Sequence, residues 1–98
     1  MGTSLKNANY LIASRMAEAA GGDADACYEL GMVFSSGGAG IAVDLIEAHK
    51  WFNLAAVAGS EAGMASRSEI AEDMTAREIA AAQASARAWL HATQRRAA

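Results

Sequence analysis

The placement of glycine and the absence of proline restrict the fold of this chain more than any other feature. Its 98 residues include no proline, and most of the nine glycines gather at Gly21 and Gly22, within 37–40 and at Gly59. An all-β domain would instead carry turn residues roughly every eight to twelve positions. The stretches between the glycine clusters therefore predict an all-α fold, in which long helices are separated by glycine breaks.

Composition limits the chain to one small helical domain. Apolar residues make up 53% of it and charged residues 19%, so the chain is too hydrophobic to remain disordered. A chain of 98 residues leaves no room for a second folded unit. Much of the apolar share is alanine, whose small side chain lets helices approach closely. We therefore expect a single domain over 1–98, built by packing helix on helix.

Apolar spacing and capping residues predict five helices. The predicted segments, with their caps included, are 4–20, 23–37, 44–59, 60–73 and 75–94. Thr75 and Glu78 form a capping box, in which each side chain bonds the backbone N–H of the other residue. Asp44 and Glu47 are predicted to form the same reciprocal pair. The short loops between these helices require antiparallel neighbours.

The second predicted helix contains a glycine at an unfavourable place. Gly31 lies inside the helix, where glycine costs about 1 kcal/mol relative to alanine. A neighbouring backbone pressed against Gly31 would explain why the chain has no side chain there.

An internal repeat with an offset of about 37 residues relates two parts of the chain, which is typical of a helical solenoid. The aligned residues are Ala19, Ala20 and Gly22 with Ala55, Ala56 and Gly59. The segment 22–59 also resembles the Sel-1-like repeat, a relative of the tetratricopeptide repeat. The positions that carry the resemblance are Ala26, Leu30, Gly31, Phe34, Ile41, Asp44, Ala48, Trp51, Phe52, Ala55, Ala56 and Gly59.

The resemblance implies a short right-handed α-α superhelix of about five antiparallel helices. Residues 22–59 would form one full repeat, 4–20 would be a capping helix from a partial repeat, and 60–95 would be a partial repeat with a long terminal helix. Two departures are visible. The loop is one residue longer than usual, and Phe34 stands where the family more commonly has tyrosine.

The resemblance further implies a non-catalytic scaffold that binds a protein partner on an exposed helical surface. If Ala26, Leu30, Val33 and Phe34 turn inward, the other side of the same helix faces the concave surface of a solenoid. The candidate partner-binding residues on that side are Asp25, Tyr28, Glu29 and Met32. The alternative is that Tyr28 and Met32 pack against the first helix.

Residues with reactive or metal-ligating side chains do not form a recognisable site. Cys27 is the only cysteine and lacks an activating histidine nearby, so we expect a structural or merely exposed thiol. His49 has no second histidine four residues away, and we expect it on the surface. The loop 37–40 lacks the Lys and Ser or Thr of a phosphate-binding loop. We expect no catalytic residue, no metal site, no cofactor and no enzymatic activity.

The last predicted helix supports an alternative function. Its C-terminal part has no acid, and its basic residues could contact nucleic acid. These residues are Arg87, His91, Arg95 and Arg96. Cations at a helix C-terminus are also the expected complement of the helix dipole, and a net charge of −3 disfavours a nucleic-acid surface. A small regulatory protein that binds nucleic acid through this helix is therefore the alternative to a scaffold.

The number of repeats and the N-terminus lead to two further expectations. Solenoids need about three repeats for stability, so a homodimer could cover an apolar face left on the first helix. No signal peptide is readable at the N-terminus, and no segment approaches the roughly 20 apolar residues of a membrane span. We expect a cytoplasmic protein with no membrane contact, or a periplasmic one if a leader has been removed.

Overall fold

The computed structural model describes residues 3–97, and it describes the side chains of residues 9–38 and 40–94. The helices are α1 (Thr3–Ala20), α2 (Ala24–Ser36), α3 (Leu45–Val57), α4 (Glu61–Ala71) and α5 (Ala76–Ala97), with a short 3-10 turn η1 (Gly38–Gly40) between α2 and α3. Residues 3–97 contain no strand. The all-α prediction and its number of α-helices are confirmed for the described chain.

Local capping explains where four of these helices begin. The Asp23 carboxylate accepts a hydrogen bond from the backbone N of Ala26 at 3.1 Å, as an N-cap does. At the start of α5, the backbone N of Thr75 donates to Glu78 at 2.8 Å, and the backbone N of Glu78 donates to the Thr75 hydroxyl at 3.1 Å. The predicted capping box is therefore confirmed. Ser60 caps α4 by accepting from the backbone N of Gly63 at 2.9 Å.

The reciprocal pair predicted at the start of α3 is only half formed. Asp44 accepts from the backbone N of Glu47 at 3.1 Å. The Glu47 carboxylate does not return the bond, because it accepts from the indole Nε1 of Trp51 at 3.3 Å and lies 3.6 Å from the Lys50 ammonium. The sequence pattern predicts that Glu47 caps the helix, but Lys50 and Trp51 on the next turn bind its carboxylate instead.

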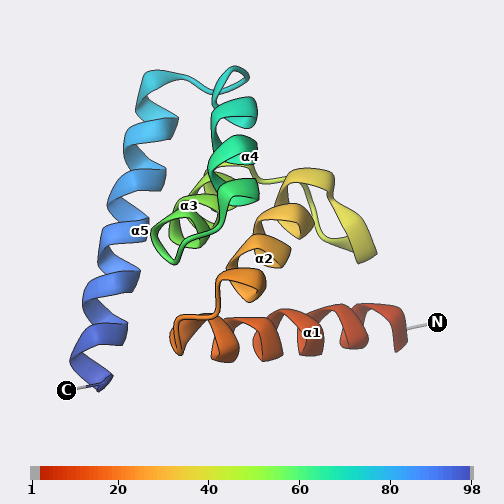
Figure 1. The fold of residues 1–98 in the computed structure, drawn as a ribbon. Helices are drawn as coiled ribbons and strands as arrows, with labels where there is room; N and C mark the ends of the chain where they lie inside the picture. Colours follow the sequence, from red (N-terminus) through yellow and green to blue (C-terminus); the bar gives the residue numbers. More distant parts are fainter. Residues whose placement is uncertain (1–2, 98) are drawn as a thin grey trace.

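Helix α3 is the centre of the fold. Helices α2, α4 and α5 all pack against it, and α1 packs against α2 (Figure 1). Helices α4 and α5 make only marginal contact with each other, so the last two helices meet through α3. Trp51 and Phe52 of α3 and Leu30 of α2 are the largest fully buried side chains.

An aromatic contact attaches α5 to α3. The rings of Trp51 and Trp89 meet edge to face with their centroids 4.9 Å apart, a favourable geometry for two aromatic rings. Ala82 and Ala86 of α5 are buried, and their small side chains allow the helix to approach α3 closely. Helix α5 therefore packs on α3 through this face.

Glycines provide the closest approaches of α2 and α4 to α3. What lies against Gly31 is the ring of Phe52, so the predicted neighbouring backbone is wrong. In α4, Gly63 is buried against the side chain of Ala55, whereas Ala62 and Ala65 are exposed. Helix α4 thus faces α3 through a residue without a side chain.

Candidate functional site

A hollow of about 340 Å³ lies between α2 and α4. We call it the α2–α4 groove, and its lining residues are Tyr28, Met32, Ser35, Phe52, Ser66, Glu69 and Ile70. The two helices lie side by side and run in roughly the same direction (Figure 1). Its volume is at the lower end of the range for ligand pockets, which suits a single side chain of a partner better than a large cofactor.

The base of the groove is aromatic. Phe52 of α3 is buried, and the half-buried ring of Tyr28 packs on it with centroids 5.6 Å apart and a tilt of 48°. Beside them, Met32 leaves 44% of its surface exposed. Methionine adapts its shape to different contacts, and exposed methionine and tyrosine are common at protein interfaces.

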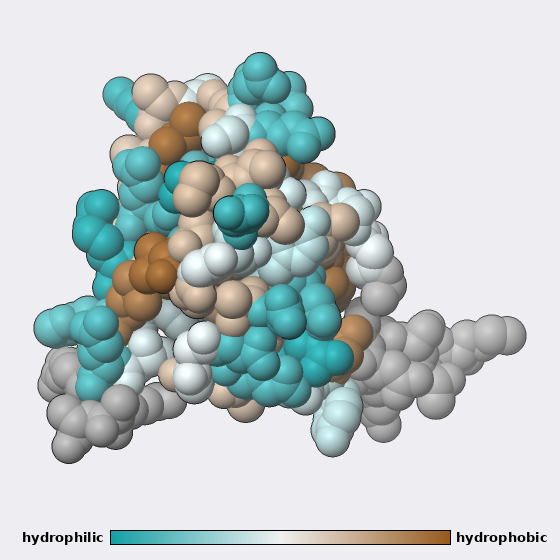
Figure 2. All heavy atoms as spheres, in the orientation of Figure 1, coloured by the Kyte–Doolittle hydropathy of each residue, from teal (hydrophilic) through white to brown (hydrophobic). Residues whose placement is uncertain are grey.

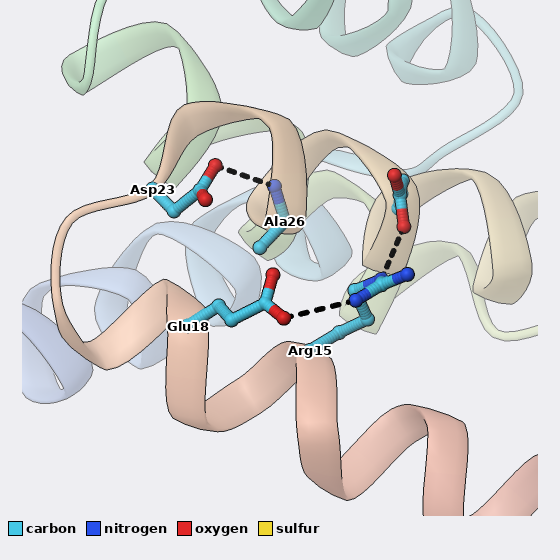
Figure 3. A network of polar contacts seen from close by, with 5 residues as sticks. Arg15, Glu18, Asp23 and Ala26 are labelled. Carbon is cyan, nitrogen blue, oxygen red and sulfur yellow. Dashed lines mark hydrogen bonds and ion pairs between the residues drawn. The ribbon is translucent and has the colours of Figure 1, made fainter.

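The structure separates the four predicted partner-binding residues. Tyr28 and Met32 line the groove together. Glu29 instead forms an ion pair with Arg15 of α1, which also lies 3.0 Å from Glu18 (Figure 3). Asp25 is exposed in the first turn of α2 and does not line the groove. The contact with the first helix is thus made by Glu29, whereas Tyr28 and Met32 line the groove.

The ion pairs of Arg15 connect α1 to α2. Hydrogen bonding and charge from Glu29, with a smaller effect of Glu18, raise the pKa of the Arg15 guanidinium above its ordinary value. All three side chains remain partly open to water, where such pairs add little to the stability of a fold. Glu29 is thus engaged in a structural contact and is less free to meet a partner than Met32.

The sequence analysis missed the contribution of α4. Ser66, Glu69 and Ile70 form the opposite wall of the groove. The internal repeat contained the signal for them, because the offset that relates Gly22 to Gly59 also relates Met32 to Glu69. Applying the offset to the candidate face of the second helix would have identified this carboxylate.

A second hollow, of about 310 Å³, lies where the C-terminal part of α5 passes the ends of α1 and α3. Its apolar lining includes Cys27, Leu54, Val57, Trp89 and Leu90. Figure 2 shows a hydrophobic patch beside α5 at this height, and Val57 is a large apolar residue left exposed there. Burial, and to a lesser degree the charge of Asp23, raises the pKa of the Cys27 thiol to about 11. This thiol is therefore buried and unreactive, in agreement with a structural cysteine.

His49 is buried, so the predicted surface position is wrong. The residue lies on the side of α3 that α4 covers, where Arg67 donates a hydrogen bond to Asn53 at 2.5 Å. Burial, and then the charge of Arg67, lowers the pKa of His49 below its ordinary value. The Nδ1 atom has no hydrogen-bond partner among the described residues. The described residues as a whole contain no group of three His, Cys, Asp or Glu side chains that could hold a metal ion.

The basic residues that could contact nucleic acid belong to α5. Arg87 and His91 are exposed there, while the side chains of Arg95 and Arg96 lie outside the described residues. None of the helices in the described residues is both long enough and apolar enough to cross a bilayer.

Comparison with known proteins adds no relative. No family model, curated protein or solved structure matches the chain.

Proposed function

We propose that this protein is a non-catalytic interaction module of the Sel-1-like repeat kind, which binds a segment of a partner protein in the α2–α4 groove. The observation that carries the proposal is the groove itself, since it combines an aromatic base with the exposed side chain of Met32. Interfaces gain most of their affinity from such apolar anchor points surrounded by polar groups.

In this proposal, α2 and α3 form the complete repeat within a short right-handed superhelix. Helix α1 stands for the second helix of a preceding unit, and α4 with α5 stands for an incomplete following unit. Support comes from equivalent positions, because Ala26 of α2 and Gly63 of α4 are both buried and are related by the offset between Gly22 and Gly59. A groove between first helices of successive repeats follows from this arrangement.

A scaffold agrees better with the chemistry of the described residues than an enzyme does. Cys27 is buried with a raised pKa, and neither histidine lines the groove. Glu69 is the one ionisable carboxylate in the groove lining, where general acid–base chemistry would need a second group. We therefore propose binding without a chemical step and without a cofactor.

A selection experiment tests the proposal. The immobilised protein is used to select binders from a phage-displayed library of random peptides, and the affinities of the synthetic peptides are measured by fluorescence anisotropy. Met32→Ala removes the exposed side chain of the groove and should weaken binding about fivefold, equivalent to about 1 kcal/mol. Met64→Ala is the matched control, because Met64 is similarly exposed, at 50%, and does not line the groove.

The two variants decide the outcome. A loss of affinity in Met32→Ala with unchanged affinity in Met64→Ala supports the proposal. Failure to select any peptide, or peptides that bind Met32→Ala as tightly as the original protein, would overturn it.

Nucleic-acid binding through α5 is the alternative function. The exposed Arg87 and His91 favour it, whereas the net charge of −3 disfavours contact with phosphates. Salt-dependent retention on a DNA or RNA column would favour this alternative over a scaffold. Absence of retention at low salt would exclude it.

A further inference from the structure

The α2–α4 groove is electronegative where the two helices end. Ser35 belongs to the last turn of α2, and Glu69 and Ile70 belong to the last turn of α4. A helix C-terminus carries a partial negative charge, which a basic residue in the last turn usually offsets. Neither helix has a basic residue in its last turn. Residues from the C-terminal turns of both helices therefore line the groove.

A free carboxylate adds a full negative charge at the same place. Glu69 is exposed, lines the groove and forms no ion pair or side-chain hydrogen bond with the described residues. The nearest cation in the sequence, Arg67, donates its hydrogen bond to Asn53 of α3 instead. No Lys, Arg or His lines the groove. Nothing described in the protein thus neutralises this charge.

The rest of the lining is apolar and suits an aliphatic stem. The partly exposed ring of Tyr28, which packs on the buried Phe52, offers aromatic surface, and Met32 and Ile70 also line the groove. Lysine and arginine side chains bury their methylene stems on such surfaces while the charged end stays near water or a carboxylate. Aromatic faces also attract cations directly.

We propose that the α2–α4 groove recognises its partner through a lysine or arginine side chain. The stem lies on Tyr28 and Met32, and the charged end meets the Glu69 carboxylate in the last turn of α4. This inference rests on the proposed function and adds the chemistry of the partner. An acidic side chain at the same place would face Glu69 and two helix C-termini, so the groove discriminates by charge as well as by fit.

The test uses the peptides selected from the random phage library. We expect most of them to contain a lysine or arginine next to an apolar residue. Replacing that lysine by norleucine keeps the stem and removes the charge, and replacing it by glutamate reverses the charge. Anisotropy should report about a two- to fivefold loss of affinity for norleucine, as for other partly exposed ion pairs, and a larger loss for glutamate.

Variants of the protein separate a specific contact from general attraction to an acidic protein. Glu69→Gln should weaken the lysine peptide about two- to fivefold and leave the norleucine peptide unchanged. Glu69→Lys should shift a new selection away from basic peptides. Glu72→Gln is the matched control, since Glu72 is an exposed carboxylate just beyond α4 that does not line the groove. Its affinity for the lysine peptide should stay the same.

The results distinguish this inference from the proposed function. Peptides without lysine or arginine that still lose affinity in Met32→Ala would overturn the inference and leave the binding module intact. Equal effects of Glu69→Gln and Glu72→Gln would also overturn it, because they indicate general attraction. Failure to select any peptide overturns both.

Discussion

The ring of Phe52 occupies the space that a side chain on Gly31 would need. A Cβ atom built on Gly31 would come within 2.4 Å of Cδ1 and 2.5 Å of Cε1 of this ring, far inside van der Waals contact. Gly31 thus lets α2 approach α3, and it fixes the position of the aromatic ring under the α2–α4 groove. The conformational cost of a glycine inside a helix is offset by this packing.

We predict that Gly31→Ala destabilises the protein. Alanine gains about 1 kcal/mol in helix propensity, whereas overpacking a buried site costs about 1–3 kcal/mol, so the net loss should reach up to about 2 kcal/mol. The free energy of unfolding in urea measures it. In Gly21→Ala, the control, the new Cβ would lie 3.4 Å from the nearest heavy atom outside the adjacent residues, and little change is expected.

A double variant identifies the cause. If the ring produces the loss, Gly31→Ala should cost less in a Phe52→Leu background than in the original protein, because the smaller side chain leaves room for the added methyl group. Equal costs in both backgrounds would contradict the assigned contact.

The helices could be predicted from the sequence because their signals are local. The N-caps at Asp23 and Asp44 and the capping box of Thr75 and Glu78 act within one turn, and each is found in the structure. The burial of His49 could not be predicted in this way. It depends on where α4 crosses α3, and the sequence between the two helices does not specify that placement.

The candidate site was predictable only on one side for the same reason. Tyr28 and Met32 follow from the helical period of α2, which assigns them to the face opposite the core. The same period cannot tell that Glu29 will meet Arg15 of α1, or that Glu69 will line the other wall. Both facts depend on how separate helices pack.

We predict that stability falls in mild acid because of His49. Burial and Arg67 lower the pKa of this histidine in the folded protein, so the unfolded chain binds a proton more readily. The free energy of unfolding should therefore decrease as the pH falls below about 6.5, the ordinary pKa of histidine, and level off below the folded-state pKa. His49→Gln should flatten this dependence, whereas the exposed control His91→Gln should not. Identical pH profiles for both variants would contradict the assignment.

The Cys27 thiol should react slowly in the folded protein. Its side chain is buried, and its pKa is raised to about 11, so very little thiolate exists at pH 8. A disulfide exchange reagent such as DTNB should label it far more slowly in buffer than in urea. Labelling in buffer at the rate of a free cysteine would disprove the burial.

We expect the protein to self-associate through α1. Tyr10 and Leu11 leave 79% and 43% of their surfaces exposed on this helix, and a second copy would cover them. Light scattering should report a mass above the 10.1 kDa of one chain at high concentration, and Leu11→Lys should lower it. Val57→Lys, at an exposed apolar residue of α3, is the control. A monomeric mass across a wide concentration range would exclude the dimer.

The most direct test of the central claim is an NMR measurement of contacts between the protein and a selected peptide. If the α2–α4 groove binds the partner, intermolecular nuclear Overhauser effects should connect the peptide to the methyl groups of Met32 and Ile70. Effects confined to Tyr10 and Leu11 of α1, or to Val57 beside α5, with none to Met32 or Ile70, would contradict it.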